Sequence, residues 1–362
     1  MDMRRAIIIN PPQAGVRFER LPDENRPAPN QIKVRAIYTG ICGTDRELAN
    51  GLLKHSIPPE GKEFMILGHE VIGEVVDKGK DVDEFEIGDK VVGLARRRCG
   101  KCLSCEMGRP DLCETGQMPI AGVKGKDGFM ADTFNDEAKF FVKLPDTITD
   151  ESAVLIQPLG DIIKAVYTGI NALNSRFTWY CRDSTLRCRT AMILGTGSTG
   201  LLFSMLLKTL GLKVILVNRR GPTSAEESIT KSVGVSFLRI DEELPLVDLL
   251  IDTSGSTVSL LRALQRVRPN GGVILFGFGL GDESTFKAQH LTDLVYRNIL
   301  VLGSAAHGKI HLEEAVKQFE IIKSYYNEAI KKMITRVIYP EEAIPYIMKK
   351  QENEIKIVMK WR

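Results

Sequence analysis

Four of the seven cysteines lie within a fifteen-residue stretch whose spacing suits a metal ion. The pattern is Cys99-x2-Cys102-x2-Cys105-x7-Cys113. Four thiolates are the ligand set of a closed, tetrahedral structural zinc site, which leaves no position for a substrate. The alternative, four unmetallated thiols, is disfavoured because thiols this close together bind metal or oxidise. We therefore predict a structural zinc lobe over residues 95–115.

A second, more dispersed group of metal-ligand types lies upstream. Cys42 follows one strand-like segment, and His69 and Glu70 precede another. A thiolate, an imidazole and a carboxylate fit an open zinc site, in which a vacant position accepts a substrate oxygen. A lone histidine beside an apolar strand is more often a core residue, but the pairing with Cys42 favours the metal.

A glycine-rich turn follows an apolar, strand-like segment and opens a helix-like one. It reads Gly195, Thr196, Gly197, Ser198, Thr199, Gly200. This is the G-x-G-x-x-G pattern in its expected strand–turn–helix context. The glycines permit a tight turn, close approach of backbone N–H groups to a pyrophosphate, and close helix–strand packing, while the helix N-terminus adds partial positive charge. We predict a dinucleotide site; a turn without a ligand is the alternative.

The end of the next strand bears on which dinucleotide binds. An Asp or Glu at this place binds the ribose 2′-hydroxyl of NAD, whereas this chain has Asn218 followed by Arg219 and Arg220. Asparagine does not repel a 2′-phosphate, and guanidinium groups suit one. The segment therefore favours NADP, and it still permits NAD because Asn218 can hydrogen-bond a free hydroxyl. A solvated basic pair is the alternative.

Hydrophobic periodicity divides the chain into two kinds of structure. From residue 6 to about 144, short strand-like runs alternate with turn residues. From Pro158 onward, strands alternate with helices, which predicts a parallel, doubly wound sheet, and the C-terminal part returns to mixed character. We expect an α/β protein with a discontinuous catalytic domain at 1–164 and 306–362 and an inserted nucleotide-binding domain at 165–305.

The composition excludes several classes of function. The 362-residue chain has an average globular composition, with 43% hydrophobic and 26% charged residues. Its formal charge of +3 is too small to predict nucleic acid or an anionic membrane as a partner. No apolar run approaches the ~20 residues of a membrane span, and no signal peptide is recognised. We expect a cytoplasmic protein with a small-molecule ligand.

The segment Gly68-His69-Glu70-x2-Gly73-x5-Gly79-x2-Val82 resembles the signature of the zinc-containing medium-chain alcohol dehydrogenases. Within that superfamily the chain is most similar to the archaeal glucose dehydrogenases, over essentially its full length. The motifs that carry this similarity are Ile41–Glu47, Gly108–Asp111, Gln157–Leu159 and Asn218–Arg220. The resemblance implies a GroES-like, β-rich catalytic domain and a Rossmann domain, with two zinc ions per chain and NADP or NAD as coenzyme.

The resemblance also implies roles for single residues. Cys42, His69 and Glu70 hold the catalytic zinc, and Gln157 is a further ligand of the metal or a contact of the sugar. Thr44 supplies the hydroxyl that relays the substrate proton, alone or together with Glu70.

Other implied contacts concern the substrate and the nicotinamide. Pro158 suits the first turn of a helix, so that Gln157 and Asp161 stand four residues apart on one helix face, and we predict that both point to the substrate. The nicotinamide end of the coenzyme is held near two tripeptides: Phe276, Gly277 and Phe278, and Ala305, Ala306 and His307.

Three residues depart from the glucose-enzyme pattern at positions that grip sugar hydroxyls. Ala95 and His307 stand where Asn is expected, and Ile120 stands where Glu is expected. The first and the last of these changes remove hydrogen-bonding capacity, at about 1–3 kcal/mol for each hydroxyl left unpaired. The alternative for His307 is a plain surface residue. The departures make D-glucose a less firm prediction than sugar oxidation.

The resulting expectation is NAD(P)-dependent oxidation of an aldose at C1 to the aldonolactone. D-glucose is the first candidate, D-galactose or a related sugar the second, and the product would feed sugar catabolism of the Entner–Doudoroff type. The alternatives are a polyol, threonine or simple alcohol dehydrogenase of the same superfamily, and an inactive zinc scaffold or binding protein. A zinc-free quinone reductase is disfavoured because it needs none of the cysteine ligands.

The sequence leaves two further features undecided: the oligomeric state, and whether Cys181 and Cys188 form a disulfide. The family implies a homodimer or homotetramer, and the apolar segment Ile299–Leu302 is a candidate edge strand for pairing between subunits. Cys181 and Cys188 flank a loop before the first strand of the nucleotide domain, either as a disulfide or as two independent thiols.

Overall fold

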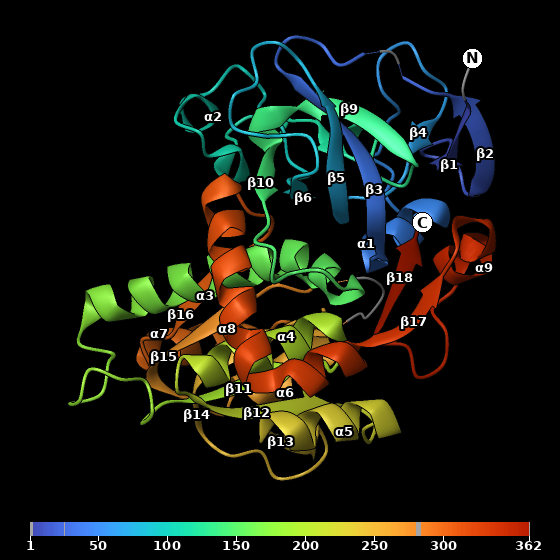
Figure 1. Ribbon diagram of the computed structural model, residues 1–362. Coiled ribbons are helices and arrows are strands. Elements are labelled where there is room, and N and C mark those ends of the chain that lie inside the picture. The colour runs from blue at the N-terminus through green and yellow to red at the C-terminus, as the bar shows by residue number, and fades with distance from the viewer. Residues whose placement is uncertain (1–2, 25, 280–283, 362) are drawn as a thin grey trace. The chain divides into compact units, whose positions relative to one another are not determined.

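Figure 1 shows a computed structural model of the protein, which describes residues 3–24, 26–279 and 284–361. The chain divides into two compact units. The first unit comprises Met1–Gly160, Ala306–Val316 and Ile334–Arg362, and the second comprises Asp161–Ala305 and Lys317–Met333. The first unit is thus made of three separate segments of the chain, and the second of two.

The first unit consists mainly of β-strands. They are β1 (Met3–Ile9), β2 (Arg17–Pro22), β3 (Gln31–Ile41), β4 (Met65–Ile66), β5 (Val71–Lys78), β6 (Lys90–Gly93), β7 (Ile120–Ala121), β8 (Gly125–Lys126), β9 (Thr133–Glu137), β10 (Phe141–Lys143), β17 (Ile334–Ile338) and β18 (Lys356–Lys360). In β3 the buried residues Ile32, Val34 and Ala36 alternate with half-exposed ones, which is the pattern of a strand with one face on a core.

The order of strands brings the two ends of the sequence together. The main sheet runs β10-β6-β5-β3-β18-β17, with β9 also paired to β3, and a smaller sheet runs β2-β1-β4. The C-terminal strand β18 is antiparallel to β3, and Ile357 lies opposite Ile41. Residues near position 356 therefore lie beside those near position 41.

Short helices connect these strands. They are α1 (Gly43–Ala49), α2 (Leu103–Glu106), α9 (Ala343–Met348) and the turns η1 (Pro110–Leu112), η2 (Ala138–Phe140), η3 (Glu151–Leu155) and η4 (Pro340–Glu342). Two longer helices, α3 (Ile156–Arg176) and α8 (Lys309–Met333), begin in the first unit and continue in the second.

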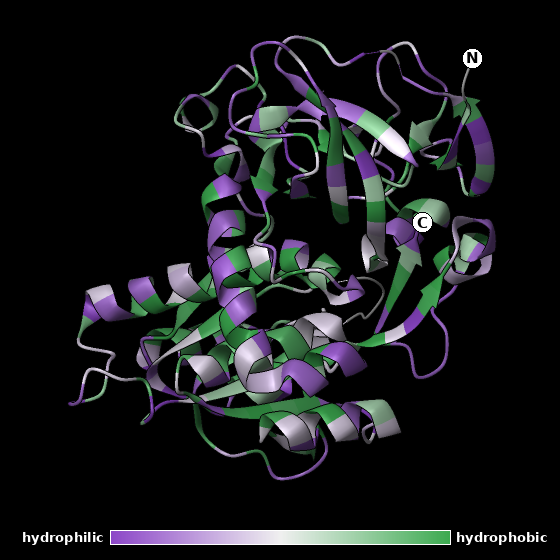
Figure 2. Cartoon of the chain, viewed as in Figure 1, coloured by the Kyte–Doolittle hydropathy of each residue, from purple (hydrophilic) through white to green (hydrophobic). Residues whose placement is uncertain are grey.

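The second unit is the doubly wound sheet that the sequence predicts. Its parallel strands run β13-β12-β11-β14-β15-β16. They are β11 (Thr190–Leu194), β12 (Lys213–Asn218), β13 (Ser236–Arg239), β14 (Val247–Asp252), β15 (Val267–Leu275) and β16 (Leu300–Gly303), with helices α4 (Ser198–Thr209), α5 (Ser224–Val233), α6 (Thr257–Leu264) and α7 (Ala288–Tyr296) between them. Figure 2 colours most of these strands as hydrophobic, as expected for a sheet covered on both faces.

The division between the units differs from the predicted domain limits in two places. It falls after Gly160 and not after residue 164, and Lys317–Met333 groups with the second unit. That part of α8 buries Phe319, Ile322 and Ile330, and Lys332 Nζ donates to Ser228 Oγ of α5 at 2.9 Å. The helical spacing of these apolar residues was visible in the sequence, but not the surface that would cover them.

The sequence analysis recognised no membrane span, yet the segment Glu151–Arg176 is long and apolar enough to be one. However, 78% of its apolar window is buried inside the protein. Its residues Leu159, Ile163 and Val166 are completely buried. The segment is apolar because it is a core helix of a folded protein.

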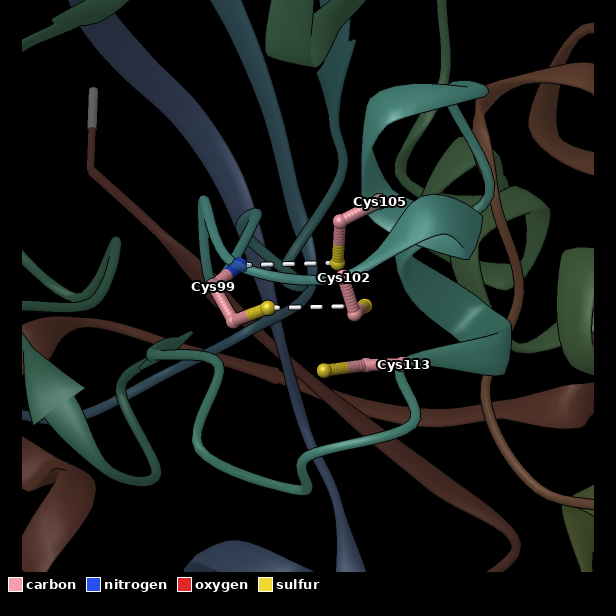
Figure 3. Close-up of side chains that lie close together, drawn as sticks. All are labelled: Cys99, Cys102, Cys105 and Cys113. Atoms are coloured by element: carbon pink, nitrogen blue, oxygen red, sulfur yellow. Dashed lines mark hydrogen bonds between the residues drawn. The ribbon is translucent and has the colours of Figure 1, made fainter.

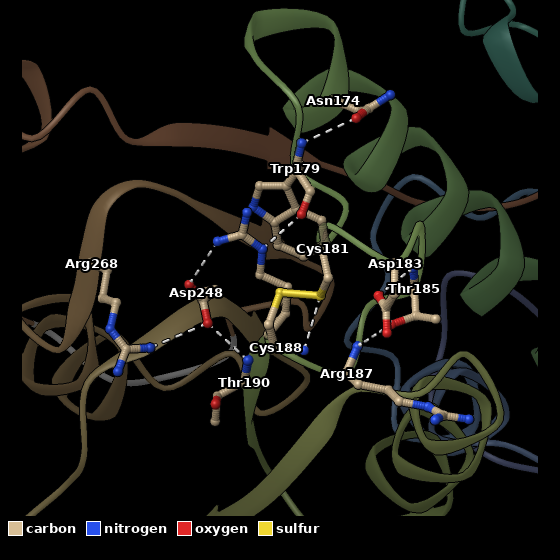
Figure 4. The surroundings of a disulfide bond; sticks show 11 residues. Asn174, Trp179, Cys181, Asp183, Thr185, Arg187, Cys188, Thr190, Asp248 and Arg268 are labelled. Carbon is tan, nitrogen blue, oxygen red and sulfur yellow. Dashed lines mark hydrogen bonds and ion pairs between the residues drawn. A yellow bond between two sulfur atoms is a disulfide. The ribbon is translucent and has the colours of Figure 1, made fainter.

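Cys181 and Cys188 form a disulfide, which decides between the two alternatives left by the sequence. Figure 4 shows that it closes a short loop just before β11. Beside it Arg189 stacks over the Trp179 ring, donates to Trp179 O at 2.7 Å and contacts Asp248 of β14. The loop is thereby connected to the N-terminal ends of two strands of the parallel sheet.

We expect the disulfide to contribute stability to the second unit. Closing so short a loop removes unfolded-state entropy worth about 2 kcal/mol, so a phosphine reductant should lower the melting temperature by about 5 °C. Scanning calorimetry with and without the reductant measures the shift. In a Cys181→Ala/Cys188→Ala variant the reductant should have no effect; a shift of the same size there would mean that the reductant acts elsewhere.

Candidate functional site

Three potential metal ligands converge in the first unit. Cys42 follows β3 as the N-cap of α1, and His69 and Glu70 lie between β4 and β5. Strands β3 and β5 are antiparallel neighbours, with Thr39 opposite Val71. This register brings the ligand atoms of Cys42, His69 and Glu70 to within 4.8 Å of one another.

Two glycines make room for this cluster. Gly68 has φ +93°, and a Cβ there would meet Met130 N at 3.1 Å, so the turn that presents His69 needs a residue without a side chain. A Cβ on Gly40 would lie 1.9 Å from Glu70 Oε2. Glycine in β3 therefore opens the space that the Glu70 carboxylate fills.

Asp45 is a residue of this site to which the sequence analysis gave no role. Its carboxylate is completely buried; Oδ2 accepts from Cys42 N at 2.8 Å, and Oδ1 lies 3.4 Å from His69 Nδ1. With Nδ1 facing a carboxylate, Nε2 is the ring nitrogen left for a metal. The signal that could have identified Asp45 is its place three residues after Cys42 in the helix that Cys42 begins.

Lys356 is a second such residue. It comes from β18, is 3% exposed, and its Nζ lies 2.5 Å from Glu70 Oε2. Burial lowers the pKa of Lys356, but the nearby Glu70, Cys42 and Asp45 outweigh burial and hold the pKa above its ordinary value. A charged ammonium therefore stands behind the Glu70 carboxylate. No sequence signal identifies Lys356, because only the pairing of β18 with β3 brings it here.

The cluster fits a zinc ion. Thiolate, imidazole and carboxylate are zinc ligands, and three protein ligands leave a position for substrate. The ligand atoms of Cys42, His69 and Glu70 lie within 4.8 Å of one another, a spacing that one bound cation can bridge.

The other predicted contacts of metal and substrate are distributed over both units. Thr44 lies half buried in α1, next to Cys42, and Gln157 is 5% exposed at the second position of α3, both in the first unit. Asp161 belongs to the second unit. His307 is 2% exposed and packs against Gly160, where a Cβ would meet its ring at 2.9 Å, so the surface alternative for His307 is wrong.

The four clustered cysteines lie together, as their spacing predicts (Figure 3). All four Sγ atoms lie within 4.8 Å of one another, and Cys99 Sγ is 3.5 Å from Cys102 Sγ. A tetrahedral zinc with Zn–S bonds of about 2.3 Å separates its sulfurs by roughly 3.8 Å. The lobe therefore fits a zinc ion that all four thiolates surround.

Three arginines, Arg96–Arg98, directly precede the first cysteine of the lobe, but they do not form a continuous basic surface patch. Arg98 is exposed, but Arg97 is 5% exposed, forms an ion pair with Asp136 and stacks 4.2 Å above the Phe140 ring. Arg97 thus stabilises the fold of the first unit. It is not available to offset the zinc thiolates or to contact nucleic acid.

The glycine-rich turn of the second unit has the geometry of a dinucleotide loop. Gly195 ends β11 with φ +101°, and a Cβ on Gly200 would lie 2.1 Å from Gly195 O, so the first and third glycines are required. A Cβ on Gly197, the N-cap of α4, would meet nothing within 4 Å. Gly197 therefore faces open space, where a pyrophosphate fits against the helix N-terminus. Thr196, Ser198 and Thr199 complete the loop.

The residues after β12 line a small cavity. Asn218 and Arg219 border about 70 Å³ of space together with Gly195, Ile240 and Ser254. Arg219 and Arg220 are both exposed, and Arg220 also forms two short contacts with the Glu226 carboxylate. The sequence analysis did not identify Glu226; its place three residues after Thr223 in a capping box was the available signal.

The tripeptides predicted near the nicotinamide lie in different surroundings. Phe276, Gly277 and Phe278 follow β15: Phe276 packs edge-on against Phe203, Gly277 N donates to Asp252 O at 2.8 Å, and Phe278 is 70% exposed. Ala305 belongs to the second unit, whereas Ala306 and His307 belong to the first.

Two family models match consecutive stretches of the chain. Residues 28–146 match the alcohol dehydrogenase GroES-like domain. Residues 150–361 match the glucose dehydrogenase C-terminus.

Individual proteins similar to this chain agree with those models. Glucose 1-dehydrogenase of Metallosphaera sedula is 41% identical over 99% of this chain and 98% of its own. Glucose 1-dehydrogenase 2 of Caldivirga maquilingensis is 36% identical over 99% and 100%. Among solved structures, Haloferax mediterranei glucose dehydrogenase in complex with NADP, Zn and gluconolactone has a TM-score of 0.86, with 24% identity over 99% of each chain. The last likeness shows that the fold is shared.

Proposed function

The chain belongs to the glucose 1-dehydrogenase family of zinc-containing, NAD(P)-dependent dehydrogenases, and we propose that it oxidises an aldose at C1 to the aldonolactone. D-glucose is the main proposed substrate, and D-galactose or a related sugar is the second. The lactone hydrolyses to an aldonic acid, which would supply sugar catabolism of the Entner–Doudoroff type. The observation that carries the proposal is the convergence of Cys42, His69 and Glu70 within 4.8 Å, in a chain of this family.

The proposed mechanism assigns tasks to residues of the first unit. Cys42, His69 and Glu70 would hold the catalytic zinc, with Gln157 as a further ligand or a sugar contact. A zinc ion held there would supply the Lewis acidity that lowers the pKa of the sugar hydroxyl, and a bound nicotinamide coenzyme would supply the hydride acceptor. Thr44 Oγ1 accepts the hydroxyl proton and passes it toward water, alone or with Glu70.

Two neighbouring groups support those ligands. Asp45 orients the His69 ring through Nδ1, and Lys356 neutralises and positions the Glu70 carboxylate. The structural zinc would be held by Cys99, Cys102, Cys105 and Cys113, which keep the lobe folded.

Coenzyme and sugar contacts complete the proposal. The loop Gly195–Gly200 would bind the pyrophosphate, and Asn218, Arg219 and Arg220 the adenosine ribose. The nicotinamide would lie against Phe276–Phe278 and Ala305–His307, and Asp161 and His307 would contact the sugar.

Two of the departures from the glucose-enzyme pattern lie side by side. Ala121 N donates to Ala95 O at 2.9 Å and Arg96 pairs with Ile120, so Ala95 and Ile120 lie on adjacent backbone segments, each as an apolar position. An apolar position gives no hydrogen bond to a sugar hydroxyl, and we propose a broad aldose specificity for this reason. The same observation favours a less hydroxylated substrate, threonine or a simple alcohol, as the second candidate.

A spectrophotometric screen tests the function. We expect D-glucose or D-galactose to reduce NADP or NAD with kcat/KM at least tenfold above polyols, threonine and simple alcohols, and chelation to abolish the reaction until zinc is restored. Robust turnover of threonine or 2,3-butanediol with no turnover of any aldose would overturn the substrate assignment. Full activity after complete loss of zinc would overturn the mechanism.

We also propose a homodimer or homotetramer in the cytoplasm. The edge strand β16 exposes Val301, and the adjacent α7 exposes Leu291, Val295 and Tyr296. An unpaired edge beside exposed apolar side chains is a typical surface for pairing between subunits. Light scattering that gave a monomer mass would contradict the assembly.

A further inference from the structure

We propose that Glu226 determines the coenzyme preference. Its carboxylate pairs with Arg220, so that Arg219 provides the guanidinium that contacts the 2′-phosphate of NADP. The inference rests on the proposed function, because it concerns the coenzyme of the same reaction. Glu226 is then a positioning residue: it affects coenzyme specificity by holding the guanidinium of Arg220.

Each oxygen of the Glu226 carboxylate, at the N-terminus of α5, accepts two hydrogen bonds. Glu226 is 4% exposed; Arg220 Nη1 lies 2.7 Å from Oε2, and Arg220 Nη2 lies 2.8 Å from Oε1. Thr223 N donates to Oε2 at 2.7 Å, and Thr196 Oγ1 donates to Oε1 at 2.7 Å. The fork of Arg220 is therefore occupied by a bidentate contact of the kind that a phosphate would otherwise make.

This carboxylate is charged at neutral pH. Burial raises the pKa of Glu226, but the hydrogen bonds from Arg220, Thr223 and Thr196 outweigh burial and hold the pKa below its ordinary value. The negative charge that NAD-binding folds carry at the end of the second strand is thus present here, although Asn218 occupies that place. In this chain the negative charge is carried by Glu226, which belongs to the next helix, α5.

A chain of hydrogen bonds links the Glu226 carboxylate to Asn218, the residue proposed to bind the adenosine ribose. Because the Thr196 hydroxyl donates to Glu226, it accepts from Asn218 Nδ2 at 2.6 Å. Asn218 Oδ1 accepts from Arg219 N at 2.7 Å. Glu226 therefore fixes the orientation of the Asn218 amide as well as the position of Arg220.

Arg219 is differently placed. Both arginines are exposed, but Arg219 lines the 70 Å³ cavity beside Gly195 and Asn218, and its guanidinium has no ion-pair partner among the described residues. Two guanidinium groups and one carboxylate leave one positive charge near the ribose. One free guanidinium attracts a 2′-phosphate less strongly than two, and this balance explains why neither NADP nor NAD would be excluded.

Calorimetric titration with 2′,5′-ADP and ADP tests the proposal without catalysis. Glu226→Gln removes the charge but keeps the capping box, which accepts glutamine as well as glutamate, so that α5 retains its N-terminus. We expect Glu226→Gln to bind 2′,5′-ADP about tenfold more tightly, the effect of one added charge-assisted contact, and ADP within about twofold of wild type.

Three further variants test whether the change in affinity comes from the Glu226–Arg220 pair and from Arg219. Glu226→Gln/Arg220→Gln restores the net charge of wild type and should lose the gain. Glu227→Gln removes the same charge one residue along α5, where Glu227 pairs with Lys231 in solvent, and should change neither affinity. Arg219→Gln alone should weaken 2′,5′-ADP at least tenfold and spare ADP, which tests the assignment even if Glu226→Gln folds poorly.

The proposal is overturned if Glu226→Gln weakens 2′,5′-ADP, because Glu226 would then present Arg220 to the phosphate. It is also overturned if the ratio of the two affinities does not change, which would leave Glu226 a helix cap only, or if Arg219→Gln keeps wild-type affinity. Failure of wild type to bind either nucleotide would overturn the proposed coenzyme use as well. Binding of both nucleotides with an unchanged ratio would overturn this inference alone.

Discussion

Replacing Cys42 with alanine should reduce turnover by about a thousandfold or more while coenzyme binding is retained. The thiolate is one of the three proposed ligands of the open site, and the Lewis acid it would help to hold is worth several kcal/mol of transition-state stabilisation. The zinc content should fall from two ions per chain to one, because the four-cysteine lobe is intact. Steady-state kinetics, metal analysis and coenzyme titration measure the three quantities.

The matched control is a variant that removes two sulfur atoms outside both metal sites. Cys181→Ala/Cys188→Ala should keep two zinc ions and wild-type turnover at a temperature below its melting point. If Cys42→Ala kept two zinc ions and normal turnover, Cys42 would not be a ligand and the catalytic site would have to be sought elsewhere.

In protein from which the catalytic zinc has been removed, replacing Lys356 with methionine should destabilise the first unit by about 3–5 kcal/mol. Methionine fills a similar volume but leaves the Glu70 carboxylate, which is 1% exposed, without its counter-charge. Removal of one partner from a buried ion pair is costly because the remaining charge is neither paired nor hydrated.

The two tryptophans allow the units to be followed separately. Trp361 belongs to the first unit and donates to Thr39 Oγ1, whereas Trp179 belongs to the second. In a Trp179→Phe background, denaturant unfolding followed by the fluorescence of Trp361 reports the stability of the first unit.

Two controls separate the charge effect from simple loss of lysine. Lys360→Met makes the same substitution at a half-exposed position of β18 and should cost less than about 1 kcal/mol. Lys356→Met/Glu70→Gln removes both charges and should recover most of the lost stability. A cost of Lys356→Met no greater than that of Lys360→Met would show that Lys356 does not compensate Glu70.

Much of the candidate site was predictable because its ligands come in short, local patterns. The four cysteines are close in sequence, and the glycine-rich turn contains its own context, since strand, turn and helix are consecutive. The parallel sheet followed from alternation of strands and helices, and the fold class was confirmed. These features depend on residues within a few tens of positions of one another.

The site residues that the sequence did not predict act on residues that are distant in the sequence, or act through a neighbouring side chain. Asp45, Lys356 and Glu226 gain their roles from contacts with His69, Glu70 and Arg220, and single-sequence patterns do not encode such pairs unless they fall on one helix turn. His307 was open between site and surface because its burial depends on the packing of Gly160. The apolar helix α3 shows the same limit: composition does not reveal whether protein covers it.

The amino-acid sequence alone decided which chemistries are available to this protein: two sets of zinc ligands, a dinucleotide turn and a basic pair after the second strand. Only the folded chain decided how their charges are balanced. Pairing of β18 with β3 placed an ammonium behind Glu70, and the capping box of α5 placed a carboxylate on Arg220. The physical reason is that residue types and short spacings fix which groups are present, whereas electrostatic environment depends on distances that only tertiary packing sets.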